Sequence, residues 1–417
     1  MSDSSERTPT IATIDEIRDS FPALRRNQGS RTVGYFDAPG GTQVPAAVAE
    51  AVAQQMLHHN ANAHWAFETS RELDEVIAAS RSALADFLGG DEDEVVLGPN
   101  MTTLTFHVAR ALGRTWEAGD EVVVTELDHQ ANVSPWRDLE VERGVVVRTV
   151  PLVAETGDLD WADFEKALSS RTRLVAATAA SNALGTIVDL ERVRGLASSA
   201  GALLFVDAVH FAPHERIDVS SIGCDFLACS PYKFYGPHVG VLWGREALLR
   251  EVLPPKLGPA PDAPPERWET GTLNHEGIAG AGAAVDYLAS LGTEGSRKER
   301  LDAVFAQLSR RGEALIARMW AGLAAIPGVT LYGPPPGHPR TPTLALTIDG
   351  LAPALAAAQL SADWGLFLSH GNFYASLVTE RLGLEPQGLL RAGCACYTTD
   401  EEVGRLVAAV GQLAAPG

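Results

Sequence analysis

The chain has 417 residues, and its 46% hydrophobic and 21% charged residues are typical of a globular protein. This length exceeds what one hydrophobic core usually organises, so we expect two domains. The 33 Lys and Arg residues against 53 Asp and Glu residues give a formal net charge of −20, which disfavours nucleic acid and anionic membranes as partners.

Neither targeting nor metal binding is expected from the sequence. Residues 1–10 have neither the apolar core nor the basic lead of a signal peptide, and no uncharged apolar run reaches membrane-spanning length, so we expect a cytoplasmic protein. The four cysteines, at positions 224, 229, 394 and 396, form no C-x-x-C pair. We therefore expect four reduced thiols and no metal site.

The first predicted elements precede the main domain. Apolar residues spaced from Ile14 to Leu24 predict a short amphipathic stretch, and YFDAPGG at 35–41 predicts an extended segment that ends in a tight turn. Residues 68–88 give the clearest helix, because apolar side chains recur at three- and four-residue steps and Gly89 follows directly.

From residue 95 onward, short apolar runs alternate with helical segments. The runs cover residues 95–97, 121–125, 145–150, 173–178, 202–207, 225–229 and 239–243. Continuous β-rich runs separated by helices indicate an α/β fold with a mostly parallel sheet that is buried on both faces.

The C-terminal third has a different pattern. Residues 276–325 are predicted to be helical, 333–340 form a proline-rich loop, and strands and helices then alternate up to an amphipathic helix near 400–414. We predict an N-terminal segment (1–30) that packs on the small domain, a large α/β domain (31–285) and a small C-terminal domain (286–417).

Two residues in the stretch 202–245 indicate chemistry. Asp207 ends a predicted buried strand, where α/β sheets bind ligands, and Lys233 follows in SPYKFYGPHVG. An acid and a lysine so placed suit pyridoxal 5'-phosphate (PLP), because a carboxylate keeps the pyridine nitrogen protonated and a lysine amine forms the Schiff base. Taken singly, Asp207 also fits a helix cap and Lys233 also fits a surface lysine.

Other strand ends carry residues that suit the same cofactor. Asn100, Met101 and Thr102 open a helical segment whose N–H groups would hold a phosphate, although Thr102 alone also fits a plain N-cap. His129 would stack on an aromatic ring, and Asn182 would hydrogen-bond a ring hydroxyl. Their order and their strand-end positions favour one binding site.

This ordered set resembles the class V aminotransferase family, in its cysteine-desulfurase-like branch of fold-type I PLP enzymes. The matching motifs are LDHQANVSPW, SNALGTI, FVDAVH, SPYKFYGPHVG, ETGTLN and LLRAGCACYTTDEEV. The resemblance implies the PLP-transferase fold type I, with a large domain around a mostly parallel sheet and a smaller α+β C-terminal domain. It also implies an amino acid as the substrate and a homodimer with shared active sites.

The resemblance also implies a role for each matching residue. Lys233 forms the Schiff base and Arg391 binds the substrate carboxylate. The remaining cofactor contacts are Asp207 at the ring nitrogen, His129 on the ring, Asn182 and His210 near the ring, Tyr232 beside the lysine, Asn100, Met101, Thr102 and Ser230 at the phosphate, and Thr272 reaching a phosphate across the dimer interface.

Three positions depart from the family pattern. His210 replaces the usual glutamine, Tyr232 replaces the histidine that precedes the lysine in desulfurases, and Tyr374 occupies the place of the desulfurase cysteine in LFLSHGNFYASL. Without a thiolate in that loop no persulfide forms by the desulfurase route. The first two departures each keep a polar group near the cofactor.

The missing cysteine favours another outcome of the same chemistry. We predict β-elimination from a cysteine S-conjugate (a C–S lyase), with Lys233 as base, Tyr374 as a phenolic acid and a relaxed loop whose Asn372 and Phe373 contact the substrate. Asn62 and His64, in NANAHWAFETS, are further candidate substrate contacts. Decarboxylation-dependent deamination, transamination and epimerisation remain open, since the residue types barely separate them.

Two other classes of protein fit the sequence less well. A nicotinamide-dependent dehydrogenase predicts a G-x-G-x-x-G motif after the first strand, which the sequence lacks. A non-catalytic scaffold with the PLP fold predicts loss of Lys233, Asp207 or Arg391, and all three are present.

Overall fold

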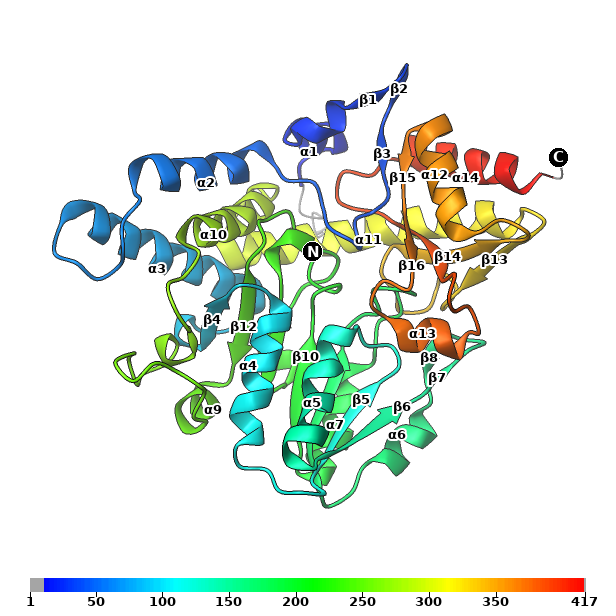
Figure 1. Cartoon of the computed structure of the whole chain (residues 1–417). Helices are drawn as coiled ribbons and strands as arrows, with labels where there is room; N and C mark the ends of the chain where they lie inside the picture. Colours follow the sequence, from blue (N-terminus) through cyan, green and yellow to red (C-terminus); the bar gives the residue numbers. More distant parts are fainter. Residues whose placement is uncertain (1–10, 416–417) are drawn as a thin grey trace, which may run out of the picture.

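The structure, a computed structural model, describes residues 11–415 (Figure 1). Its centre is a seven-stranded sheet in the order β4-β12-β11-β10-β9-β5-β6. The strands are β4 (Val95–Gly98), β5 (Glu121–Thr125), β6 (Val146–Val150), β9 (Thr172–Thr178), β10 (Leu203–Asp207), β11 (Phe226–Cys229) and β12 (Gly240–Gly244). Only β12 runs antiparallel to its neighbours in this sheet. The predicted α/β fold with a mostly parallel sheet is confirmed.

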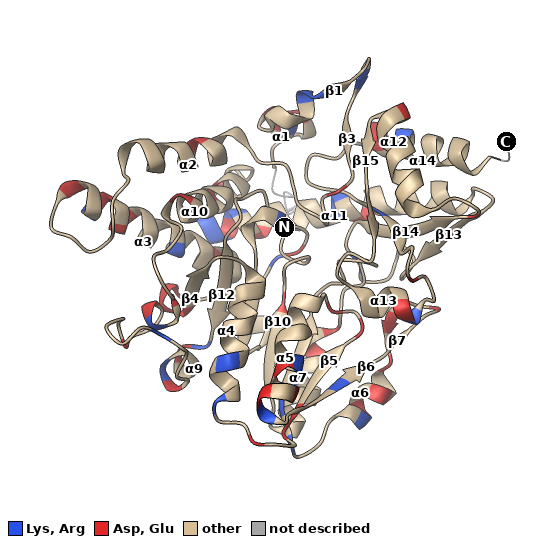
Figure 2. Ribbon diagram, in the orientation of Figure 1, with Lys and Arg blue, Asp and Glu red and all other residues tan. Residues whose placement is uncertain are grey.

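Both faces of this sheet are buried, which explains the continuous apolar runs. In β10, Leu204 and Val206 enter one core cluster, whereas Phe205 enters the other, on the opposite face. The first cluster is covered by α3 (Glu68–Leu88), α7 (Leu190–Ala200) and α10 (His275–Ser290), and the second by α4 (Met101–Gly113) and α5 (Ser134–Arg143). Figure 2 shows that charged residues lie mostly on helices and loops outside the sheet.

The longest helices show where local sequence sets the ends. Helix α3 has the predicted bounds and ends at Gly89, whose left-handed φ of 74° suits glycine. The helix predicted over 276–325 is interrupted, which corrects that expectation. It divides into α10 and α11 (Arg297–Ala324), because Ser296 and Glu299 form a capping box that starts a new helix.

A second sheet is built from the C-terminal part of the chain. It has the order β13 (Val329–Tyr332), β14 (Thr343–Ile348), β17 (Leu389–Gly393) and β16 (Ser369–Gly371), with antiparallel pairs throughout. Helices α11, α12 (Pro353–Trp364) and α14 (Asp400–Ala414) pack on it around a separate core cluster. The exact domain boundaries stay a prediction.

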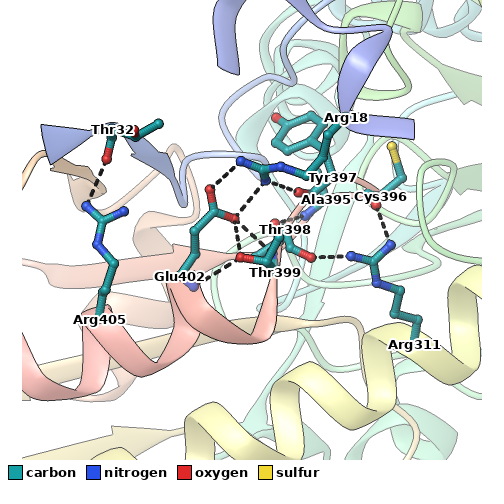
Figure 3. Close-up of polar contacts among 10 residues, drawn as sticks. All are labelled: Arg18, Thr32, Arg311, Ala395, Cys396, Tyr397, Thr398, Thr399, Glu402 and Arg405. Carbon is teal, nitrogen blue, oxygen red and sulfur yellow. Dashed lines mark hydrogen bonds and ion pairs between the residues drawn. The ribbon is translucent and has the colours of Figure 1, made fainter. Parts of the chain in front are cut away.

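The N-terminal segment contacts both parts of the chain. On α1 (Ile14–Asp19), the Arg18 guanidinium pairs with Glu402 (3.1 Å) and donates to the Tyr397 carbonyl (Figure 3). Phe21 packs edge-on against two tyrosines, Tyr235 in the core of the large sheet and Tyr397 near the start of α14. Farther on, β3 (Gly34–Tyr35) pairs in parallel with β15 (Leu366–Phe367). The segment therefore joins the regions around the two sheets.

The remaining elements are short. Helix α2 (Ala46–His58) packs against α10. The others are β1 (Asn27–Gln28), β2 (Arg31–Thr32), β7 (Leu152–Val153), β8 (Asp158–Leu159), α6 (Trp161–Ala167), α8 (Val219–Ile222), α9 (Glu246–Glu251) and α13 (Ser376–Arg381). Among residues 11–415, no helix combines the length and apolar character needed to cross a membrane.

Candidate active site

A cavity of about 630 Å³ lies at the carboxyl ends of β5, β9 and β10, and the segment between β16 and β17 also lines it. Most of the predicted site residues line this one cavity, namely Asn100, Met101, Thr102, His129, Asn182, Asp207, His210, Ser230, Tyr232, Lys233, Phe373, Tyr374 and Arg391. Residues far apart in the sequence meet here because parallel strands deliver their following loops to the same edge of the sheet.

Lys233 follows β11 at the end of a short 3-10 helix and is only 8% exposed. Its Nζ donates to the carbonyl oxygens of Pro39 and Gly40, the latter at 2.9 Å. Burial, and then the positive charge of Arg391, lower the pKa of Lys233 to about 7. A large share of the amine is therefore uncharged at neutral pH, as a nucleophile or base requires.

Asp207 is the last residue of β10 and is buried. One carboxylate oxygen accepts from the Val209 amide at 2.9 Å, and burial raises the pKa of Asp207 to about 6. A carboxylate buried in this way is stabilised by a cationic partner, and a protonated pyridine nitrogen would supply one.

His129 holds its imidazole against the cavity. Its Nδ1 accepts from the Ala131 amide at 3.0 Å, and its ring centre lies 5.5 Å from that of Tyr374. Burial, and then the charges of Lys233 and Arg391, lower the pKa of His129 to about 4. The ring is therefore neutral, which suits stacking on an aromatic cofactor.

The start of α4, where the sequence predicted a phosphate cradle, lies at the cavity. Asn100 caps the helix by accepting from the Thr103 amide at 2.8 Å, and the Met101 amide donates to Ser230 Oγ at 3.1 Å. Thr102 follows in the exposed first turn. The unpaired N–H groups and the dipole of this helix N-terminus attract an anion.

Among the residues that line the cavity, two buried polar atoms have no partner, namely Asn182 Oδ1 and His210 Nδ1. The other ring nitrogen of His210 contacts the hydroxyls of Thr341 and Thr343, each at 3.0 Å. Buried polar atoms normally find partners, so these two indicate a ligand with polar ring substituents. Together with Lys233 and Asp207, they fit pyridoxal phosphate.

Arg391 is buried on β17, and two of its partners, Asp37 and Ser369, were not predicted from the sequence. Its Nη1 donates to the Asn182 carbonyl at 2.8 Å, and its Nε donates to Ser369 Oγ at 3.1 Å. Asp37 Oδ1 lies 3.7 Å from Nη2, and the Phe373 ring lies 4.0 Å from the guanidinium carbon. Burial lowers the pKa of Arg391 to about 10, so it stays charged at neutral pH.

The loop with Tyr374 is anchored and not relaxed, which corrects our expectation. Asn182 Nδ2 donates to the Phe373 carbonyl at 2.9 Å, and the Gln130 amide donates to the Tyr374 carbonyl at 2.7 Å. Phe373 and Tyr374 both adopt a left-handed backbone, with φ of 58° and 56°. The Tyr374 side chain is 73% exposed at the rim of the cavity.

Four predicted residues do not line the cavity of the single chain. Asn372 builds the loop, since its side chain accepts from the Tyr374 amide and donates to Glu385, each at 3.2 Å. Asn62 and His64 lie in the exposed segment before α3, where His64 contacts Asp74. Thr272 is exposed as well, and the contact predicted for it needs a second subunit.

The cysteines are all buried, and none lines the cavity. Burial raises the pKa of Cys394 and Cys396 to about 12. Their thiols stay protonated at neutral pH, so neither is an activated nucleophile.

Comparisons with known proteins agree with this site. The sequence profile of the family "Aminotransferase class-V" matches residues 34–406. The cysteine desulfurases of Pectobacterium carotovorum and Dickeya dadantii are each 32% identical to this chain over 96% of its length. The match covers 98% of the Pectobacterium protein and 96% of the Dickeya protein. The solved cysteine desulfurase of Thermococcus onnurineus NA1 has a TM-score of 0.88 at 29% identity, covering 97% of this chain and 99% of that one.

A second solved structure, the cysteine desulfurase CsdA of Escherichia coli, has a TM-score of 0.82 at 28% identity and covers 97% of this chain and 98% of its own. The chain belongs to the class V aminotransferase family. It is a PLP-dependent enzyme with fold type I, as the sequence motifs predicted.

Proposed function

We propose that the enzyme cleaves the Cβ–S bond of a cysteine S-conjugate by β-elimination. One observation carries the proposal: Tyr374 stands in the loop that holds a catalytic cysteine in desulfurases, and all four cysteines of this chain are buried away from the cavity. The similar proteins named cysteine desulfurases act on a sulfur-containing amino acid. A shared fold with a different loop residue favours a related C–S cleavage that needs no thiol.

The chain's own residues supply binding and proton transfer. Arg391 binds the α-carboxylate, and the uncharged Lys233 amine removes the proton from Cα. Bound pyridoxal phosphate supplies the electron sink for the resulting negative charge. The electron pair forms the Cα–Cβ double bond as the Cβ–S bond breaks, and water then converts the released enamine into pyruvate and ammonia.

The departing thiolate needs space and a proton. The cavity opens towards the rim at Tyr374, whose exposed phenol is available to protonate the sulfur. Phe373 already packs on Arg391, so it forms one wall beside the substrate carboxylate. An S-substituent that extends past this wall reaches solvent, which favours conjugates over free cysteine.

A product assay tests the proposal. The purified enzyme is incubated with cysteine, with S-benzylcysteine as a bulky conjugate and with alanine, and pyruvate, thiol and persulfide are measured. Pyruvate and benzyl thiol from the conjugate alone support the lyase. Persulfide from cysteine contradicts it, and products that retain the sulfur indicate transamination, epimerisation or decarboxylation instead.

We also propose a homodimer. Large apolar side chains are exposed at Met56, Leu57, Trp65 and Phe67 and again at Leu253 and Leu257. These segments lie on one side of the molecule in Figure 1, where water would otherwise cover an apolar surface. Sedimentation equilibrium gives twice the chain mass of 44.2 kDa if the proposal holds, and a monomer contradicts it.

A further inference from the structure

Asp37 lies beside both cationic residues of the site. Its backbone bridges Gly393, two residues after Arg391, and its Oδ1 is 3.7 Å from Arg391 Nη2. The chain then turns so that the Pro39 and Gly40 carbonyls accept from Lys233 Nζ. The carboxylate is therefore held at the junction between the cofactor lysine and the carboxylate-binding arginine.

One oxygen of this carboxylate has no hydrogen-bond partner. Asp37 Oδ1 is buried, and its distance to Arg391 is too long for a hydrogen bond. A buried carboxylate oxygen without a donor is costly, so a site that keeps one offers a place to a ligand cation. The side chain as a whole is 46% exposed, which leaves the carboxylate within reach of a ligand.

The local sequence makes room for this arrangement. A Cβ atom at Gly40 would lie 2.6 Å from Asp37 Oδ1, closer than real atoms approach. Only glycine at position 40 leaves the carboxylate where it is. The turn YFDAPGG thus places the acid at the site as well as the two carbonyls that hold Lys233.

We propose that Asp37 binds the α-ammonium group of the incoming amino acid while Arg391 binds its α-carboxylate. The inference rests on the proposed function only in taking an amino acid as the substrate. The two charges of an amino-acid zwitterion are separated by roughly 3 Å, close to the spacing of the Asp37 and Arg391 groups. The zwitterion therefore pairs with both side chains at once and brings its nitrogen to the side of the site where Lys233 lies.

This arrangement gives specificity for amino acids over plain carboxylates. Before the substrate binds, Asp37 partly neutralises Arg391 and so competes with any carboxylate for the guanidinium. A ligand with an ammonium group compensates for this competition, whereas a ligand without one does not. If Asp37 only positioned Arg391, its loss would weaken both kinds of ligand alike.

The test compares L-alanine with propionate, which has the same carbon skeleton as alanine but no amine. Neither compound carries a β-leaving group. Binding to the holoenzyme is measured by calorimetry and by the change in the visible absorbance of the cofactor. In Asp37→Asn, we expect alanine to bind at least about tenfold more weakly, while propionate binds equally well or more tightly. Asp163→Asn, which alters an exposed surface pair with Lys166, is the control and should change neither.

Each outcome is decisive. Equal weakening of both ligands, or unchanged alanine binding, overturns the role of Asp37. Asp37→Glu provides a second variant that keeps the charge, and we expect it to retain more of the alanine affinity than Asp37→Asn. If the wild-type holoenzyme binds neither ligand, the role of Asp37 is overturned as well, whereas failure of the proposed function is a distinct result, seen as no pyruvate from S-benzylcysteine.

Discussion

Burial of Lys233 predicts a pH-dependent cost to the stability of the cofactor-free protein. The folded chain lowers the pKa of this lysine from its ordinary 10.5 to about 7. The unfolded chain therefore binds one more proton than the folded chain between these values, and stability rises with pH across this window. Replacing Lys233 by methionine removes the titrating group while keeping a similar volume.

The magnitude follows from the size of the shift. Each pKa unit corresponds to about 1.4 kcal/mol, so a shift of this size costs several kcal/mol at pH 7 and below. We expect apo Lys233→Met to be more stable than the apo wild type at pH 7, with the difference falling by roughly 2 kcal/mol by pH 9.

Urea unfolding of both apo proteins, followed by circular dichroism at pH 7, 8 and 9, measures this difference. Titrating groups distant from Lys233 are common to both proteins and cancel, and His129, whose pKa the Lys233 charge lowers, is uncharged throughout this pH range. A stability difference that stays constant with pH, or that grows as the pH rises, would refute the assignment of a buried, largely uncharged amine at Lys233.

The other predictions concern single side chains. Arg391→Lys keeps the charge but loses the planar fork, so KM for the amino acid should rise about tenfold in steady-state assays with little change in cofactor content. Asp207→Asn should still bind the cofactor, as absorbance will show, but lower kcat on the order of 100-fold because the pyridine nitrogen loses its anionic partner. Arg18→Ala leaves Glu402 buried without its cation, and thermal unfolding should show a loss of about 3 kcal/mol, whereas Lys166→Ala, at an exposed pair, should change the stability little.

Most of the central sheet was predictable because its inner strands are buried on both faces, whereas the edge strand β6 is partly exposed. The run 202–206 is apolar at every position, so the strand is recognised without an alternating pattern and is distinct from the amphipathic helices that flank it. The break between α10 and α11 was missed because both helices are amphipathic and the capping box at Ser296 is a local signal inside a long helical pattern. Strand order was accessible only through the family resemblance, since pairing depends on contacts that a single sequence does not encode locally.

The site residues likewise include some that the sequence predicted and some that it did not. Residues at strand ends, such as Asp207 and His129, were found because parallel strands bring their ends to one edge. Asp37 and Ser369 were missed because their importance comes from contact with Arg391 across long sequence distances. Asp128, which directly precedes the cavity residue His129, was also not predicted. It is buried and accepts from Thr125 Oγ1 at 2.7 Å, and burial raises its pKa to about 7.

The most direct test of the account is the position of the cofactor. Borohydride reduction of the purified protein, followed by peptide mass spectrometry, should find one pyridoxyl phosphate group per chain, attached at Lys233, with loss of the visible absorbance. A protein that takes up no pyridoxal phosphate, or that carries the label on a different lysine, would contradict the assignment of Lys233 and of the site built around it.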